Sequence, residues 1–361
     1  MLRRKSRKIK VGKLEIGDGM PISIESMTTF DTKKIEAVID QIKELEFAGC
    51  DIVRIAIYDN ECTDTIRILK SSTEIPLVAD IHFDHRLAIA SIENGIDMVR
   101  INPGNIGRTE GVKHLVAVAK EHDVPIRIGV NSGSLSGEIL KRYGNTAKAM
   151  VESALEQIAV LEEAGYDKIL LSLKSSNVRK TVEACREISR LTDYPLHIGV
   201  TEAGTVLNGS IKSSVGIGAL LLEGIGDTLR VSLTAPPIEE VRVGLEILRC
   251  LGLRNDSIEI ISCPTCGRCR IDIINIANVL KDSLKDVKYP LKIAVMGCAV
   301  NGPGEAKEAD IGIAGGQGKA ILFKRGQIVG TLPFNDIVNT LTEEVRRMAA
   351  DGCSNNNTGI Q

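Results

Sequence analysis

The chain has 361 residues, of which 43% are hydrophobic, with a formal net charge of −2 at pH 7 and a pI near 6.3. Balanced charge excludes the broad basic field of a nucleic-acid-binding surface, and no apolar run reaches the roughly 18 residues that a membrane span needs. Aromatic residues make up 3% and tryptophan is absent, so the core must be aliphatic, as in a parallel sheet covered by helices.

The cysteines and the N-terminal segment indicate the cellular compartment in which the protein is expected. The chain has nine cysteines, and an odd number with a cluster at 263–269 favours reduced thiols and a metal over a disulfide framework. The basic start MLRRKSRKIK lacks the apolar stretch and cleavage site of an export signal. We therefore expect a cytoplasmic protein with a solvated, partly frayed N-terminus.

The first 235 residues contain short aliphatic runs that alternate with amphipathic helical patterns. Strands that alternate with helices pair in parallel through right-handed crossovers. The eight expected strands are 22–27, 52–57, 77–81, 98–103, 126–130, 169–173, 196–200 and 229–233.

The residues just before these strands alternate between two patterns, one for even-numbered strands and one for odd-numbered strands. Gly49, Gly95 and Gly165 each begin a Gly-x-Asp triplet before an even-numbered strand, where a left-handed residue would end the preceding helix. Pro76 and Pro125 stand at the start of odd-numbered strands. A two-unit repeat with eight strands predicts an α/β fold of the (β/α)8 TIM-barrel type over residues 1–252. The alternative is a doubly wound open sheet, which the absence of a G-x-G-x-x-G fingerprint disfavours.

A smaller α+β domain is expected over residues 253–350, followed by a disordered tail at 351–361. The run SIEIIS predicts a strand, a helical pattern follows, and LKIAVM predicts a second strand. Glycine-rich strands and a last helix complete the domain. The tail is poor in apolar residues.

Five basic residues fall on the expected barrel strands or at their ends, which is unusual because a buried guanidinium needs an anion. One explanation is that each is paired with a carboxylate in the core. Because all five would converge on the C-terminal face of the barrel, a diphosphate ligand is the better explanation. These residues are Arg54, Arg100, Arg127, Lys174 and Arg230. The long Gly/Ser-rich loop after 126–130 would cover or shape the same site.

The strongest motif is C-x2-C-x2-C at Cys263, Cys266 and Cys269, followed by Cys298 in VMGCAVNGPGE. This spacing is typical of an iron–sulfur cluster, and a zinc site would need a second pair of ligands that the sequence lacks. Two ligand sets are open for a [4Fe–4S] cluster: the four cysteines, or Cys263, Cys266 and Cys298 with Glu305. A carboxylate would make one iron labile and able to bind a substrate oxygen.

The motifs SCPTCGR, VMGCAVNGPGE, VRINPGN, IRIGVNSGSL and GVTEAG together resemble the bacterial 4-hydroxy-3-methylbut-2-enyl diphosphate synthase family in its two-domain form. The resemblance implies reductive ring opening and dehydroxylation of 2-C-methyl-D-erythritol 2,4-cyclodiphosphate with two electrons from a [4Fe–4S] cluster. It implies Cys263, Cys266, Cys298 and Glu305 as the cluster ligands, so Cys269 departs from the family's ligand set.

The resemblance also implies site residues and partners. Glu202 would donate a proton, with Glu305 as a second catalytic residue. The enzyme would be a homodimer with its active site across the subunits, and flavodoxin or ferredoxin would supply electrons. The substrate-binding residues would be Arg54, Arg100, Arg127, Asn131, Lys174, Thr201 and Ser232.

Two other hypotheses are a barrel aldolase or phosphate-sugar synthase with a structural zinc, and an electron carrier without a substrate of its own. Neither nucleic acid nor a membrane is expected as a partner.

Overall fold

The computed structural model describes residues 2–82, 84–101, 110–299, 304 and 306–356. The chain forms two compact units, and the division between them falls after Leu253. Each unit has its own sheet and its own apolar core. None of the described helices is long and apolar enough to cross a membrane.

The first unit is a barrel of eight parallel strands, as the strand pattern predicted. Strands β10 and β3 pair with each other, and a parallel bridge between Leu171 and Leu196 joins the two ends of the sheet order. This closure rules out the open-sheet alternative. The strands are β3 (Ser23–Met27), β4 (Ile52–Ala56), β5 (Leu77–Ile81), β6 (Met98–Ile101), β7 (Ile126–Asn131), β8 (Ile169–Lys174), β9 (His197–Ile198) and β10 (Thr228–Leu229).

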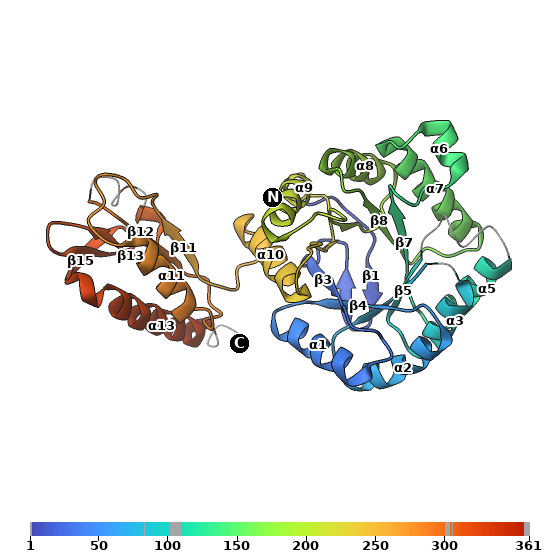
Figure 1. Cartoon of the computed structure of the whole chain (residues 1–361), viewed down its shortest axis with the longest axis horizontal. Coiled ribbons are helices and arrows are strands. Elements are labelled where there is room, and N and C mark those ends of the chain that lie inside the picture. Colours follow the sequence, from blue (N-terminus) through green and yellow to red (C-terminus); the bar gives the residue numbers. More distant parts are fainter. Residues whose placement is uncertain (1, 83, 102–109, 300–303, 305, 357–361) are drawn as a thin grey trace. The chain divides into compact units, whose positions relative to one another are not determined.

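Helices surround these strands in a ring (Figure 1). Several begin at a side chain that accepts a hydrogen bond from the first turn, as Asp59 does for α2 and Thr146 for α7. Gly49, Gly95 and Gly165 have the left-handed φ that the strand entries predicted. The helices are α1 (Ile35–Phe47), α2 (Asn60–Ser71), α3 (His85–Glu93), α5 (Glu110–Glu121), α6 (Gly137–Tyr143), α7 (Ala147–Glu163), α8 (Val178–Leu191), α9 (Val206–Leu222) and α10 (Pro237–Cys250).

The N-terminus is ordered, and the expectation of a frayed start was wrong. Strands β1 (Ile9–Val11) and β2 (Leu14–Ile16) form an antiparallel hairpin. Its apolar residues share one buried cluster with Val78, Met98 and Leu170, so the hairpin closes the N-terminal end of the barrel. The basic residues of this segment bind to the barrel because it offers acceptors: Arg3 pairs with Asp227 at 3.0 Å, and Arg4 donates to backbone carbonyls.

Side chains along each barrel strand point alternately outward to the helices and inward to the barrel interior. Outward residues such as Ile55, Ile101 and Ile128 pack under the helices in the main core. Inward residues near the N-terminal end of the barrel are apolar and contact the hairpin. The inward positions toward the C-terminal end are left for polar side chains, and they carry the site described below.

The second unit has one five-stranded sheet in the order β11-β12-β13-β14-β15, parallel as far as β13 and antiparallel beyond it. Helices α11 and α13 cover one face through an aliphatic core (Figure 1). Its elements are β11 (Glu259–Ser262), α11 (Ile273–Ser283), β12 (Lys292–Met296), η1 (Ala306–Glu308), β13 (Ile311–Gly315), β14 (Ala320–Lys324), β15 (Gln327–Leu332), η2 (Phe334–Asp336) and α13 (Ile337–Asn356).

Helix α13 differs from the expected domain end. It continues to Asn356, so the first six residues of the segment expected to be a disordered tail are helical. Buried Leu341, Val345 and Ala349 hold this helix against the sheet, and the helix continues past the last of these contacts. Residues 357–361 lie outside the described part of the chain.

Candidate active site

Charged side chains fill the interior of the barrel toward the C-terminal ends of its strands. The strand register places Asp80 beside Arg100, and Arg100 beside Arg127. We call the connected set the mouth network. It comprises Glu25, Met27, Arg54, Asp80, His82, Arg100, Arg127, Lys174, His197, Thr228, Arg230 and Glu240.

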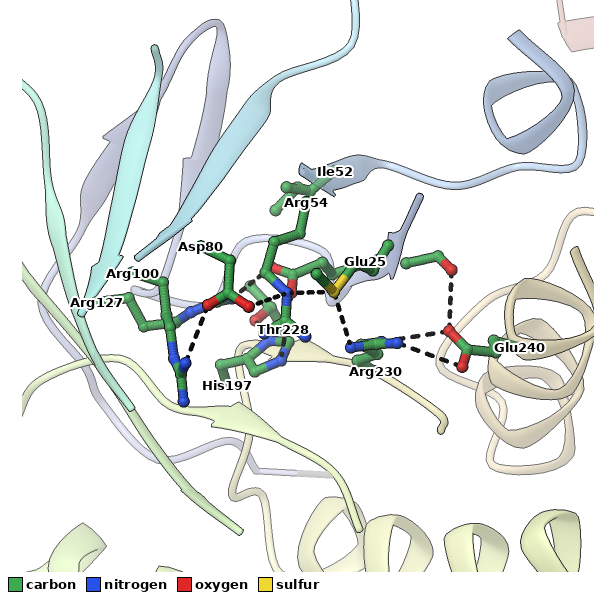
Figure 2. A network of polar contacts seen from close by, with 12 residues as sticks. Glu25, Ile52, Arg54, Asp80, Arg100, Arg127, His197, Thr228, Arg230 and Glu240 are labelled. Atoms are coloured by element: carbon green, nitrogen blue, oxygen red, sulfur yellow. Dashed lines mark hydrogen bonds and ion pairs between the residues drawn. The ribbon is translucent and has the colours of Figure 1, made fainter. Parts of the chain in front are cut away.

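The three closest arginine–carboxylate pairs of this network are drawn in Figure 2. Arg127 donates to Glu25, and both side chains are almost completely buried. Nη1 of Arg100 lies 3.0 Å from Oδ1 of Asp80. Nε of Arg230 lies 3.2 Å from a carboxylate oxygen of Glu240 on α10, a residue that also accepts a hydrogen bond from Ser26. The explanation by core carboxylates is therefore correct for Arg100, Arg127 and Arg230.

Two basic residues remain without a close carboxylate. Nε of Arg54 lies 3.8 Å from Glu25 and 3.8 Å from Asp80, and both of those carboxylates have nearer partners. Within the described residues, no carboxylate oxygen lies within 4.0 Å of Lys174, whose amine contacts the His197 ring at 2.8 Å. Five cationic side chains thus face three carboxylates. The excess positive charge is what a multiply charged anion would balance.

The local electrostatics agree with this geometry. Burial raises the pKa of Glu25, but Arg127 and Arg54 outweigh that effect and hold the pKa below its ordinary value. Burial acts in the same way on Asp80, and Arg54 and His82 lower its pKa strongly. Burial and the nearby Arg54 lower the pKa of Lys174. Glu25 and Asp80 are therefore ionised near neutral pH, whereas Lys174 loses its proton more readily than an ordinary lysine does.

Two glycines make room for the cations. A Cβ on Gly129, in β7, would lie 2.3 Å from Nε of Arg100, and one on Gly199, after β9, would lie 3.0 Å from Nζ of Lys174. A Cβ on Gly199 would also lie 2.3 Å from the backbone carbonyl oxygen of Arg230, so that position excludes a side chain, whereas a side chain at position 129 would displace the Arg100 guanidinium. Gly129 belongs to the run IRIGV and Gly199 to the run LHIGV. From the sequence, both were expected only to be part of a strand.

The other predicted substrate residues lie around the open end of the barrel. Asn131 is opposite Lys174 in the register of β7 and β8. Thr201 and Glu202 lie in the turn after β9, where Glu202 is exposed and has a φ of 52°. A non-glycine residue in this region is strained, and such strain is concentrated at functional sites. Ser232 is half-buried after β10.

A hollow of about 460 Å³ opens at the ends of β4 and β5. Its lining includes Met27, Tyr58, Asp80 and His82. Asp80 and His82 belong to the mouth network, so the hollow leads directly to the charged residues. Sequence reasoning missed Glu25 and Glu240, the anions that hold Arg127 and Arg230; their signal was an acidic residue at an inward strand position and one in the first turn of α10.

The cysteine motif lies at one edge of the second unit. Strands β11 and β12 are parallel neighbours, and Ser262 is opposite Val295. Cys263 and Cys298 therefore follow strand ends on the same edge. The backbone N–H of Gly297 donates to Sγ of Cys263 at 3.2 Å, which ties the loop after β12 to this cysteine. Cys266 is exposed on the loop that follows.

Cys269 has a different environment. Its Sγ donates to the carbonyl of Ile271 at 3.1 Å, and the side chain packs against the helix-side core. A Cβ on Gly297 would lie 2.6 Å from this sulfur. This thiol is thus accommodated within the fold of the unit. Cys50 and Cys185 are core residues, and burial raises the pKa of each to about 12.

The donor chemistry at this edge fits an iron–sulfur cluster held by Cys263, Cys266 and Cys298. Among the described residues no three metal-binding side chains already form a compact group. Glu305, the predicted fourth ligand and second catalytic residue, lies outside the described residues.

Comparisons with known proteins agree with both units. Residues 6–245 match the model of the GcpE TIM-barrel domain, and residues 259–347 match that of the GcpE protein C-terminal domain. The chain belongs to the GcpE family. A relative from Caldanaerobacter subterraneus subsp. tengcongensis, 4-hydroxy-3-methylbut-2-en-1-yl diphosphate synthase (flavodoxin), is 54% identical over 97% of this chain and 99% of its own. The enzyme of the same name from Clostridium perfringens is 55% identical over 94% and 98%, respectively. The predicted family is confirmed.

Among solved structures, dihydropteroate synthase from Stenotrophomonas maltophilia matches with a TM-score of 0.52 at 16% identity. The match covers 68% of this chain and 97% of that one. At this identity the likeness concerns the fold alone, and it agrees with the barrel of the first unit.

Proposed function

We propose that this GcpE-family chain reductively opens 2-C-methyl-D-erythritol 2,4-cyclodiphosphate and removes a hydroxyl to give 4-hydroxy-3-methylbut-2-enyl diphosphate. Relatives that match nearly the whole chain carry the name of this enzyme with flavodoxin. The observation that carries the proposal is the excess of buried cations in the mouth network, in a chain that also presents cysteines at adjacent strand ends. A barrel enzyme with only a structural zinc would not need both features.

In the barrel, some of the proposed substrate-binding residues already form an ion pair and others do not. Arg54 and Lys174 have no close carboxylate within the described part of the barrel, so their charge is available to the diphosphate. Arg100 is fixed by Asp80, which orients its guanidinium. Arg127 is buried against Glu25, but its Nη2 has no hydrogen-bond partner among the described residues, and we assign that donor to a phosphate oxygen. Asn131, Thr201 and Ser232 would supply polar contacts around the substrate.

In the second unit, Cys263, Cys266, Cys298 and Glu305 would hold a [4Fe–4S] cluster. When bound, the cluster would supply two electrons and an iron able to act as a Lewis acid. Glu202, exposed in the strained turn after β9, would donate the proton that leaves with the hydroxyl as water. Flavodoxin would reduce the enzyme in the cytoplasm.

The predicted homodimer stays a proposal, and one surface supports it. Helix α9 exposes Leu207, Ile211, Val215 and Leu222, which recur at helical spacing along one face. A second copy of this chain would cover that face, with the cluster domain of one subunit serving the barrel of the other. Replacing Ile211 by Lys should yield monomers by light scattering and lower activity; an unchanged dimer would remove α9 from the interface.

The test of the function uses protein purified without oxygen. We expect a brown protein with broad absorption near 400 nm that converts the cyclodiphosphate when reduced flavodoxin is supplied. A colourless zinc protein, or a cluster protein whose spectrum does not respond to the cyclodiphosphate, would contradict the proposal. The latter result would favour the electron-carrier hypothesis instead.

A further inference from the structure

A buried chain of polar groups lies behind Lys174, and the proposed function leaves it without a role. The Lys174 amine contacts Nε2 of His197 at 2.8 Å, and Nδ1 of the same ring contacts Oγ1 of Thr228 at 2.6 Å. The three residues come from the neighbouring strands β8, β9 and β10, and all three are buried. Figure 2 shows the His197 ring beside Thr228, within the mouth network.

While Lys174 is protonated, hydrogen-bond chemistry fixes the direction of this chain. A protonated lysine has only donors, so Nε2 of His197 must accept. Nδ1 therefore carries the ring proton and donates to Thr228. Burial and the Lys174 charge lower the pKa of His197 strongly, so the imidazole stays neutral while the lysine carries its proton.

The chain ends inside the barrel and does not conduct protons to solvent. Near the N-terminal end of the barrel, the inward residues form an apolar cluster with the hairpin, including Val78, Met98 and Leu170. Thr228 is completely buried. A polar chain that ends at a completely buried residue can orient a group, but it does not reach bulk water.

A neutral acceptor has an advantage at this position. Lys174 is surrounded by Arg54, Arg127 and Arg230, with Glu25 as the nearby anion. His197 faces the same groups, and its Nε2 lies 3.8 Å from Oε1 of Glu25. A carboxylate in place of His197 would neutralise the lysine and compete with an incoming anion. The imidazole fixes the amine and leaves its full charge to the ligand.

We propose that His197 is a positioning residue for diphosphate binding: it holds the Lys174 amine through Nε2, and Thr228 fixes the tautomer that makes this possible. The inference rests on the proposed function, because it takes the cyclodiphosphate as the ligand. It adds two residues, His197 and Thr228, that do not touch the substrate.

Two variants separate this role from packing. In His197→Gln, the side-chain oxygen reaches the place of Nε2 and can still accept from Lys174. In His197→Asn, the amide reaches only the place of Nδ1, so the contact with Thr228 remains and that with Lys174 is lost. Both substitutions leave a polar amide of similar size at a buried site, which makes them a matched pair.

The measurement is calorimetric binding of the cyclodiphosphate to the cluster-loaded enzyme, from pH 6 to pH 9. We expect His197→Asn to weaken binding about tenfold to a hundredfold, the range for a hydrogen bond to a charged group, with unchanged iron content. We expect His197→Gln to stay within about threefold of the parent. The pH above which binding weakens should shift in the Asn variant and not in the Gln variant.

Equal weakening in both variants, or parent affinity in His197→Asn, would overturn the inference while the proposed function stands. If the parent enzyme itself does not bind the cyclodiphosphate, the proposed function fails, and the inference fails with it. If His197→Asn does not fold, Thr228→Val decides. Weaker binding in that variant supports the role of the tautomer, and parent affinity contradicts it.

Discussion

The barrel mouth and the cysteine edge are built in opposite ways. In the mouth, each charged side chain stands on a barrel strand, at a strand end or on a packed helix, and the ion pairs Arg127–Glu25 and Arg100–Asp80 exist without a ligand. At the cysteine edge, Cys263 and Cys298 follow strand ends, but Cys266 is on an exposed loop. The charged groups of the mouth are therefore held in place by the fold itself, whereas the cysteines do not form a compact group among the described residues.

The largest effect is expected from Cys298→Ser. Because a hydroxyl is a poor ligand for iron, this variant should lose its absorption near 400 nm and all measurable turnover. The barrel is a separate compact unit, so calorimetry should still detect cyclodiphosphate binding through the cations. If binding disappears with the cluster, the two regions are not independent, and the contrast drawn above is wrong.

Lys174→Met tests the opposite region. Removing the cation that has no close carboxylate in the described barrel should weaken cyclodiphosphate binding by about a hundredfold. The iron content should not change. Arg249→Met, at the end of α10 and away from the mouth network, is the control and should bind like the parent. A normal affinity in Lys174→Met would show that the excess charge of the mouth does not serve an anion.

The same lysine predicts a pH dependence. Burial and Arg54 lower the pKa of Lys174, so the free enzyme loses this proton at a lower pH than an ordinary lysine does. The protonated amine attracts the diphosphate and the neutral amine does not. Affinity should therefore be highest below this pKa and fall as the pH rises through it. In Lys174→Arg the fall should be absent, because a guanidinium stays charged; a fall that persists would assign it to another group.

These contrasts also explain what could be predicted from the sequence. The strand positions and the barrel could be predicted because hydrophobic periodicity and helix-ending glycines are local features of the sequence. The cations were visible for the same reason, since Arg54 and Arg127 interrupt those runs. Their partners were not visible: Glu25 meets Arg127 from a strand about a hundred residues away, and only the closed barrel brings them together. The N-terminal hairpin was missed because its pattern is short and lies in a basic segment.

Glu25→Gln should cost stability rather than affinity alone. It leaves the guanidinium of Arg127 buried without its anion, which costs about 3–5 kcal/mol. Urea denaturation should show this loss as a lower free energy of unfolding of the barrel, while the free energy of unfolding of the second unit stays the same. Glu223→Gln, which removes an exposed pair with Arg186, should cost less than about 1 kcal/mol. Equal losses of unfolding free energy in the two variants would mean that the buried Arg127–Glu25 pair does not stabilise the barrel more than an exposed pair does.

The smallest effect is expected from Cys269→Ser, although this cysteine completes the C-x2-C-x2-C motif. Its thiol already donates to the carbonyl of Ile271, and a hydroxyl can make the same bond. The variant should keep its iron, its absorption near 400 nm and most of its turnover. If Cys269→Ser loses iron while Glu305→Ala retains it, the cluster is held by four thiolates. The cluster would then have no exchangeable carboxylate ligand, and Glu305 would lose its place in the proposed site.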